Sequence, residues 1–406
     1  MLRRWLWVLG LALLWVPVWA DPPLTSGVCV QDVTPTSALL CKILAAPAPV
    51  RLEWIPEAGG TLTTLEHPPR RRHEFALTGL QPGTRYRYRI GAEEGSFATF
   101  ARDDRKPLAF CVVGDSGGLP PWVWLQNTPL VGALARLEAL PTSREVTAIG
   151  TAMARARPDL WLHVGDVVYP WGEARHYTTA FFRPFAELLR HAPCYAMLGN
   201  HDLGNADPVR EDAGRQLLRC FHLPQGEWTG DERCYAFAAG PVRFIVLDCN
   251  QALAPGHPSL EFLARELARA DEPWLVVAGH YPIWSGSRQG DRGDLVEHLL
   301  PQLLAAKVDL FFCGHDHVYQ RFGEPGTLVQ VVTGGGGKSL YDLRDHPQRK
   351  AAAAAYHFVQ VRVEGPQLRL QALTAAGKEL DALTLDKRTL PLDPTTPRGQ
   401  RTRRLW

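Results

Sequence analysis

Five apolar runs of strand character in this chain each end in a glycine that is followed at once by a residue of a metal-binding type. These turns are Gly114-Asp115, Gly165-Asp166, Gly199-Asn200-His201, Gly279-His280 and Gly314-His315. Glycine allows a sharp turn, and in open α/β sheets ligands bind outside the carboxyl ends of the strands. A lone Gly-Asp pair is usually a turn or a helix cap. Five such turns with complementary side chains instead predict one shared metal centre.

The chain divides into an all-β part and an α/β part. Over residues 104–390, apolar runs alternate with stretches of helical periodicity, which predicts an α/β domain with a buried sheet. Over residues 21–103 the strand-like runs, among them ALLCKIL and VRLEWI, are short, and in TRYRYRIG two tyrosines and an isoleucine alternate with arginines. That pattern predicts a small β-sandwich. Its segment LTGLQPGTRY resembles the tyrosine corner of fibronectin type III domains.

Both ends of the chain differ from the rest. In residues 1–20, Arg3 and Arg4 precede an uncharged run that ends in small residues at Ala20, which predicts a cleaved signal peptide and an exported protein with no membrane anchor. The arginine pair also fits a twin-arginine signal, and an uncleaved anchor is the alternative, although Pro17 interrupts the short run. Residues 391–406 are basic and contain proline, so we expect a disordered tail.

The charge and the cysteine content of the chain argue against some classes of binding partner and one kind of metal site. A formal net charge of +2 does not favour nucleic acid or a membrane surface as partner. The eight cysteines are an even number, and export would permit disulfides; Cys29–Cys41 and Cys220–Cys234 are the candidate pairs. None of the cysteines shows paired C-x-x-C spacing, which argues against a zinc site built from thiolates.

The ligand types indicate the chemistry. Carboxylates, an amide oxygen, imidazoles and the phenol of Tyr169 suit iron, zinc or manganese, and they are too many for one tetrahedral ion. Two ions about 3.5–4 Å apart can hold both the attacking oxygen and the phosphate oxygens of an in-line displacement. The residues therefore predict a dinuclear phosphoester hydrolase.

The motifs GDSGG, GDVVY, GNHD, AGHYPIWS and CGHDHVYQ, between Gly114 and Gln320, resemble those of the calcineurin-like metallophosphoesterases. Among these, the chain is most similar to the purple acid phosphatases, particularly the small tartrate-resistant type. The resemblance implies a four-layer β-sandwich flanked by helices. The preceding all-β domain resembles the arrangement of the larger, plant-type members.

The resemblance also implies a role for each motif residue. Asp115, Tyr169 and His317 would bind Fe(III), Asp166 would bridge, and Asn200, His280 and His315 would bind a second divalent ion (iron, zinc or manganese). A metal-bound hydroxide would attack the phosphorus of small phosphomonoesters. His201 would stabilise developing charge or protonate the leaving group, and Asp202 is a second catalytic candidate.

One position departs from the family pattern. Related phosphatases carry a further histidine nine or ten residues past the Gly-His motif, where this chain has Gln289 and Gly290. Candidate substrate contacts are therefore Tyr281, Arg288 and Gln289, with Arg292 as a further possibility, and Asp202 is a candidate for proton transfer. We interpret the run Gly334–Gly337 as a tight turn, because it lacks the P-loop pattern.

Two other functions compete with an acid phosphatase. One is a phosphodiesterase or nucleotide hydrolase that uses the same site with another metal pair. The other is a non-catalytic surface binding protein with a vestigial site, against which all seven expected ligands are present. Tyr169 distinguishes the acid phosphatase from the phosphodiesterase or nucleotide hydrolase, because only a phenolate on Fe(III) produces the purple colour.

Overall fold

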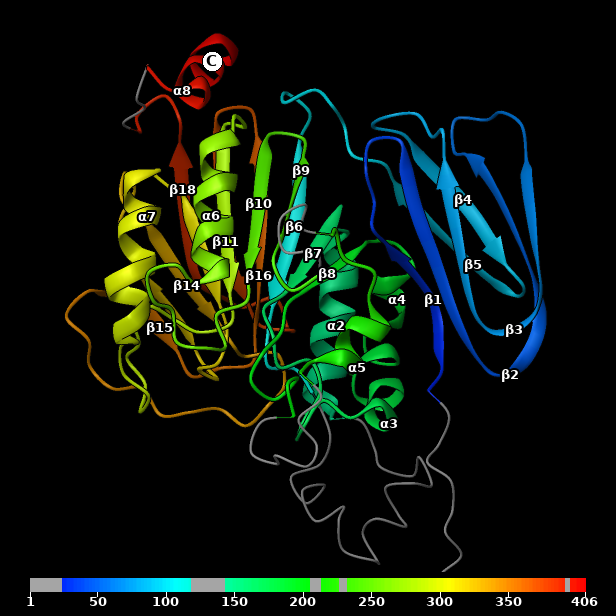
Figure 1. The fold of residues 1–406 in the computed structure, drawn as a ribbon, viewed down its shortest axis with the longest axis horizontal. Helices are drawn as coiled ribbons and strands as arrows, with labels where there is room; N and C mark the ends of the chain where they lie inside the picture. The colour runs from blue at the N-terminus through cyan, green and yellow to red at the C-terminus, as the bar shows by residue number, and fades with distance from the viewer. Residues whose placement is uncertain (1–23, 118–142, 205–212, 226–231, 391–394) are drawn as a thin grey trace, which may run out of the picture.

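The computed structural model describes residues 24–117, 143–204, 213–225, 232–390 and 395–406. The predicted signal peptide, residues 1–20, lies outside the described residues. Figure 1 shows two parts, the blue all-β part formed by strands β1 to β5 and a larger α/β part. In the described part of the chain, no helix is both long and apolar enough to cross a bilayer.

Two sheets form the framework of the α/β part. The six-stranded sheet has the order β18-β17-β16-β6-β7-β8, and the seven-stranded sheet has the order β15-β13-β14-β12-β11-β10-β9. The first comprises β6 Leu108–Val113, β7 Leu160–His163, β8 Cys194–Ala196, β16 Phe358–Glu364, β17 Gln367–Leu373 and β18 Glu379–Asp386. The second comprises β9 Tyr235–Ala239, β10 Val242–Leu247, β11 Trp274–Gly279, β12 Leu310–Cys313, β13 Tyr319–Phe322, β14 Val329–Thr333 and β15 Arg349–Ala353.

The central strands of both sheets are parallel, and this brings the motifs together. Strands β6, β7 and β8 pair in parallel, as do β10, β11, β12 and β14. Parallel neighbours end at the same edge of a sheet, so the turns that follow them become neighbours too. The five sequence motifs follow β6, β7 and β8 in one sheet and β11 and β12 in the other.

The seven-stranded sheet is buried on both faces. In β11, Val276 and Ala278 belong to the core cluster that includes the six-stranded sheet. Leu275 and Val277 instead pack with the leucines of helix α6, Pro258–Arg269, and of its neighbours. The edge-to-face contact of Phe110 with rings of the opposite sheet lies in the first of these cores. Burial on both faces explains why these strands are continuous apolar runs without alternation.

Helices complete the layers on either side. They are α2 Arg144–Ala156, α3 Ala174–Tyr177, η2 Thr178–Phe182, α4 Ala186–Leu189 and α5 Arg215–Cys220, then α6 Pro258–Arg269, η3 Leu295–Leu299 and α7 Leu300–Ala305. α2 contacts β16 of one sheet and α6 contacts β10 of the other. In Figure 1, α6 and α7 lie over the seven-stranded sheet, and α2, α4 and α5 gather beside β7 and β8. The predicted four-layer α/β architecture is confirmed.

The amino-terminal all-β part is a single five-stranded sheet. Its strands are β1 Ser26–Gln31, β2 Ser37–Pro56, β3 Thr63–Thr78, β4 Arg85–Ile90 and β5 Glu93–Ala98. The runs ALLCKIL and VRLEWI, which the sequence suggests are separate, are parts of the one long strand β2. The backbone N–H of Gln81 donates to the Tyr86 hydroxyl (2.9 Å), which is the hydrogen bond expected of a tyrosine corner. The assignment to the fibronectin type III class stays a prediction.

The expectation of a disordered tail is wrong for residues that the structure describes. Pro397–Leu405 forms the helix α8, with the Thr396 hydroxyl accepting a hydrogen bond from the backbone of Gly399. Arg398 is buried and donates to the carbonyls of Ala306 and Lys307 as well as to Asp309. The basic composition of the tail suggests that it is solvated, so the contacts of Arg398 could not be predicted from the sequence.

Neither candidate disulfide is formed, and all eight cysteines are buried free thiols. Cys29 and Cys41 lie directly opposite each other across β1 and β2, but the Cys29 thiol donates to the Gly27 carbonyl and the Cys41 thiol to the Gln31 side chain. The Cys234 thiol instead contacts the Ser259 hydroxyl (3.4 Å). Burial raises the pKa of Cys29 to about 12, so this thiol stays protonated.

Candidate metal centre

The candidate ligands leave their strands through unusual backbone conformations. Asp115, Asp166 and His315, which follow β6, β7 and β12, have φ values of 54°, 54° and 66°. Residues other than glycine rarely adopt this left-handed backbone conformation, and residues held in it cluster at functional sites. Gly199 is required for close approach, because a Cβ there would lie 2.2 Å from the Asp166 backbone nitrogen. The strained backbone conformations of these turns direct the candidate ligand side chains toward one another.

The first group of donors is Asp115, Tyr169 and His317. The Tyr169 phenol oxygen lies 3.1 Å from Oδ1 of Asp115 and 3.1 Å from Nε2 of His317. The opposite ring nitrogen of His317, Nδ1, donates to the carbonyl of Ser339 (2.7 Å). That bond makes Nε2 the ring nitrogen that faces the two oxygens. Burial alone would lower the pKa of His317, but the hydrogen bond to Asp115 and the charge of that carboxylate outweigh it and raise the pKa.

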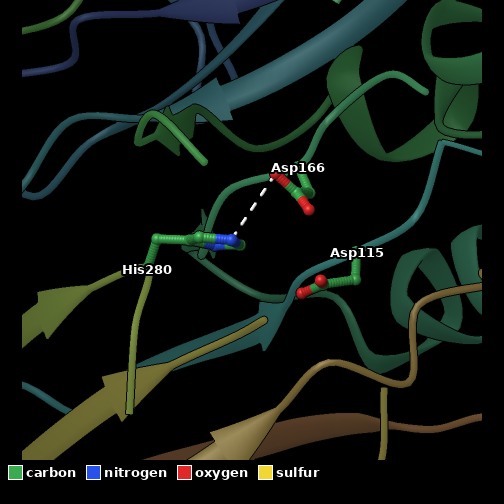
Figure 2. A group of neighbouring side chains, drawn as sticks. All are labelled: Asp115, Asp166 and His280. Carbon is green, nitrogen blue, oxygen red and sulfur yellow. Dashed lines mark ion pairs between the residues drawn. The ribbon is translucent and has the colours of Figure 1, made fainter. Parts of the chain in front are cut away.

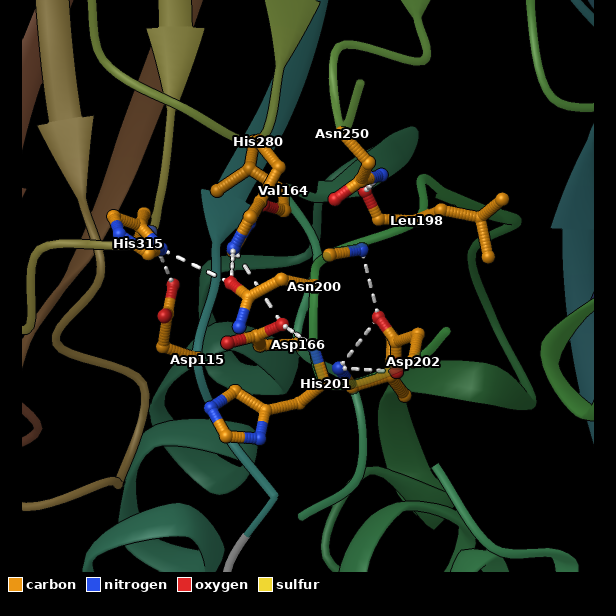
Figure 3. A network of polar contacts seen from close by, with 12 residues as sticks. Asp115, Val164, Asp166, Leu198, Asn200, His201, Asp202, Asn250, His280 and His315 are labelled. Atoms are coloured by element: carbon orange, nitrogen blue, oxygen red, sulfur yellow. Dashed lines mark hydrogen bonds and ion pairs between the residues drawn. The ribbon is translucent and has the colours of Figure 1, made fainter. Parts of the chain in front are cut away.

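The second group is Asn200, His280 and His315 (Figure 3). Oδ1 of Asn200 lies 3.1 Å from Nε2 of His280 and 3.0 Å from Nδ1 of His315. Nδ1 of His280 donates to the carbonyl of Val164 (2.8 Å), so Nε2 is the ring nitrogen that faces the amide oxygen. The amide oxygen of Asn200 thus lies beside one ring nitrogen of each histidine.

Asp166 lies between the two groups. Its Oδ2 is 2.8 Å from the Tyr169 phenol oxygen, whereas its Oδ1 is 3.5 Å from Nε2 of His280 and accepts the backbone N–H of His201 (2.9 Å). Ligand atoms of Asp115, Asp166 and His280 all lie within 4.8 Å of one another (Figure 2). Each carboxylate oxygen of Asp166 is therefore turned toward a different group of donors.

Burial and neighbouring charge set the protonation of these groups. Burial raises the pKa of Tyr169 well above its usual value, and the carboxylates of Asp115 and Asp166 raise it further. Burial would also raise the pKa of Asp166, but His280 and His201 outweigh it and hold that pKa at about 2. Burial lowers the pKa of His315 to about 3, so its ring is neutral and keeps a lone pair.

The donor set fits a pair of metal cations. Asp115 and Asp166 are almost completely buried, and among the described residues no lysine or arginine forms an ion pair with either. Buried carboxylates that lack a permanent cation are costly. The mixture of carboxylate, amide, phenol and imidazole donors is one that iron, zinc and manganese share.

The two predicted catalytic residues are placed differently. Nδ1 of His201 donates to the carbonyl of Pro170 (2.6 Å), and its ring packs against Tyr169 at 4.4 Å between centroids, which leaves Nε2 for a substrate. Asp202 is fully buried, and its carboxylate accepts the backbone N–H groups of Val167 (3.0 Å) and Gly199 (2.9 Å). This geometry is that of a residue that positions two turns (Figure 3), and the role of Asp202 in proton transfer stays a prediction.

Aromatic rings and cations surround the two groups of donors. The Tyr281 ring lies 4.3 Å from that of His315, with the Arg292 guanidinium 4.0 Å from its centroid. The Tyr341 ring stacks on His317 at 4.2 Å, with the Arg288 guanidinium 4.7 Å away. Of the predicted substrate contacts, Tyr281 and Arg288 thus lie beside the centre. Gln289 is exposed, and its backbone N–H donates to the Ser287 hydroxyl (3.1 Å).

Sequence reasoning missed Lys338 and Tyr341, which follow the glycine run after β14. A Cβ at Gly336 would lie 2.3 Å from the carbonyl of Gly114, so the run passes directly against the turn that carries Asp115. The rule that found the other turns could have found this one, because β14 is parallel to β12 and ends at the same edge.

The shared carboxylate flanked by two groups of nitrogen and oxygen donors, all at strand ends of two packed sheets, defines a dinuclear, metal-dependent phosphoesterase. Residues 109–319 match the family described as calcineurin-like phosphoesterase, and the chain belongs to that family. It is 27% identical over 317 residues to tartrate-resistant acid phosphatase type 5 of Rattus norvegicus, covering 70% of this chain and 92% of that protein.

Further similar proteins are also purple acid phosphatases. Purple acid phosphatase 7 of Arabidopsis thaliana is 25% identical over 263 residues, which cover 58% of this chain and 78% of that protein. The structure of purple acid phosphatase PPD1 from yellow lupin has a TM-score of 0.74 at 18% identity, covering 90% of this chain and 75% of that one. That likeness concerns the fold. The chain is thus homologous to the purple acid phosphatases.

Proposed function

We propose that this protein is an exported acid phosphatase that hydrolyses small phosphomonoesters at a centre of Fe(III) and a divalent iron, zinc or manganese ion. The observation that carries the proposal is the position of Asp166, with one carboxylate oxygen 2.8 Å from the Tyr169 phenol and the other facing His280. A single carboxylate shared by two donor groups suits a dinuclear centre, and the phenol in one group suits a ferric ion.

The residues that would hold the ions follow from the two groups. Asp115, Tyr169 and His317 would hold the ferric ion, and Asn200, His280 and His315 the divalent ion, with Asp166 between them. When bound, such a pair supplies Lewis acidity that polarises phosphate oxygens and activates water. Because the pKa of Tyr169 is high without a cation, the phenol would lose its proton only when a metal ion takes the proton's place.

His201 would act on the substrate through Nε2. The hydrogen bond from Nδ1 to Pro170 and the packing against Tyr169 fix the ring, so Nε2 faces a ligand without a rotamer search. In its protonated form the ring would donate to a phosphate oxygen or to the departing alkoxide. Asp202 would contribute by holding the turn of His201 against that of Asp166.

Export and domain organisation belong to the same proposal. Residues 1–20 have the charged start, apolar run and small-residue end of a signal peptide. We assign residues 21–103 to a fibronectin type III-like domain and residues 104–390 to the phosphoesterase domain. Phosphate esters in the extracytoplasmic space would then be the substrates.

Metal analysis and a visible spectrum of the purified protein test the assignment, together with hydrolysis of 4-nitrophenyl phosphate and bis(4-nitrophenyl) phosphate from acid to alkaline pH. We expect iron, a visible charge-transfer band and faster hydrolysis of the monoester. A colourless, iron-free but fully active enzyme would overturn the ferric assignment. Hydrolysis of the diester alone would establish the phosphodiesterase instead.

A further inference from the structure

Lys338 is fixed beside the metal centre by its backbone. Its N–H donates to the carbonyl of Asp115 (3.1 Å), which ties the residue after the glycine run to the turn of a metal ligand. Its ammonium lies 4.4 Å from the centroid of the Tyr169 ring, the same ring that packs against His201. The side chain therefore lies against a candidate iron ligand whose ring also contacts the candidate acid.

The charge of Lys338 has no permanent partner among the described residues. Lys350 pairs with Glu324 and Lys387 with Asp309, whereas Lys338 takes part in no ion pair in the described part of the chain. The carboxylate whose field reaches it is that of Asp166. Once Asp166 is engaged by metal ions, a half-buried ammonium is left to interact with a different anion.

The two neighbouring arginines are not equivalent to Lys338. Arg292, over Tyr281, already donates to the carboxylate of Asp294 (2.9 Å). Arg288, over Tyr341, is exposed to solvent. Lys338 is thus the cation at this centre that is both partly desolvated and without a carboxylate partner among the described residues, and desolvation strengthens its attraction to an anion.

We propose that the Lys338 ammonium contacts a non-bridging oxygen of the substrate phosphoryl group and gives the site its preference for dianionic phosphomonoesters. This inference rests on the proposed function. The relatives' further histidine is replaced here by Gln289 or Gly290, and Lys338 supplies positive charge from a different loop. A monoester carries up to two negative charges near neutral pH and a diester one, so the monoester gains more from an additional cation.

The test compares Lys338→Gln, Lys338→Arg and the exposed control Lys378→Gln, each with its metal content measured and its rates expressed per bound metal pair. We expect Lys338→Gln to lower kcat/KM for 4-nitrophenyl phosphate about ten- to hundredfold, the value of one hydrogen bond to a charged group. The rate with bis(4-nitrophenyl) phosphate should fall less than about threefold, since the diester lacks the second charge. Lys338→Arg should recover most of the monoester rate, and Lys378→Gln should match the wild type.

Calorimetric titration of the metal-loaded protein with inorganic phosphate gives a second readout, and Lys338→Gln should weaken phosphate binding by a similar factor. Equal losses with both esters, or unchanged phosphate binding, would overturn the inference. A wild-type protein that hydrolyses no monoester would overturn the proposed function instead, and the phosphate titration would still decide the role of Lys338.

Discussion

The phenol oxygen of Tyr169 lies 2.8 Å from Oδ2 of Asp166, three residues earlier in the same turn. Both residues are buried, and the phenol hydroxyl also lies 3.1 Å from Asp115. Burial and the two neighbouring carboxylates raise the pKa of the phenol, so the phenol keeps its proton until a cation binds. The position that makes Tyr169 unfavourable as a phenolate in the metal-free protein is the one that makes it a suitable ligand when a ferric ion is present.

Replacing Tyr169 with phenylalanine should abolish the visible charge-transfer band while leaving the fold intact. The ring would still pack against His201 and beneath Lys338, so the far-ultraviolet circular dichroism should not change. Iron should bind more weakly because an anionic ligand is lost. A purple Tyr169→Phe protein would show that Tyr169 is not the iron ligand.

Asp202→Asn should weaken metal binding and lower the free energy of unfolding by about 1–3 kcal/mol, because an amide cannot accept all the N–H groups of Val167, Val168 and Gly199. The measurements are thermal unfolding and metal content. With metal restored in excess, the pH profile of kcat should keep its wild-type shape. Loss of one limb of that profile would instead identify Asp202 as a proton donor.

The stability of the protein should fall in acid partly through His357, which is buried and is not a metal ligand. Burial lowers its pKa from 6.5 to about 4. The unfolded chain therefore binds a proton that the folded chain does not, so stability is complete above pH 6.5 and is lost as the pH falls toward 4. We expect the advantage of the wild type over His357→Asn in urea unfolding to shrink by up to about 3 kcal/mol across this window. Parallel curves would contradict the prediction.

Arg398→Met should detach α8 and destabilise the protein by about 3 kcal/mol, because it leaves the carbonyls of Lys307 and Pro273 without their donor and takes one of two cations from Asp309. The exposed Arg403→Met is the matched control and should unfold like the wild type. Hydrolysis below the unfolding temperature should be the same in all three proteins. Equal stability of both variants would mean that α8 contributes nothing to the fold.

Chelation should remove activity without unfolding the protein, because the two packed sheets carry the apolar core independently of the centre. The melting temperature should fall on removal of the metals, since Asp115 and Asp166 then lack a cation, and it should recover when metal is returned. Irreversible loss of circular dichroism on chelation would show that the native fold requires the bound metals.

Much of the candidate site could be predicted from the sequence. A glycine and a metal-binding residue directly after a strand place that residue at the carboxyl edge of a parallel sheet. Asp115, Asp166, Asn200, His280 and His315 all follow such strands, and the structure brings them together. The alternation in β4, with Tyr86 and Tyr88 buried, is likewise as predicted. These are local rules of period and turn chemistry, which need no knowledge of distant residues.

Other features depend on contacts between segments far apart in the chain. The role of Asp202 depends on the three N–H groups that surround its carboxylate, and that of Lys338 on a loop some 170 residues from Tyr169. The docking of Arg398 onto Asp309 spans 89 residues. By itself, the amino-acid sequence determined the strands, their turns and the set of ligand types. Only the tertiary structure decided which carboxylates converge, which one lies among backbone N–H groups and which lysine lies beside Tyr169, because burial and partner geometry are properties of the packed chain.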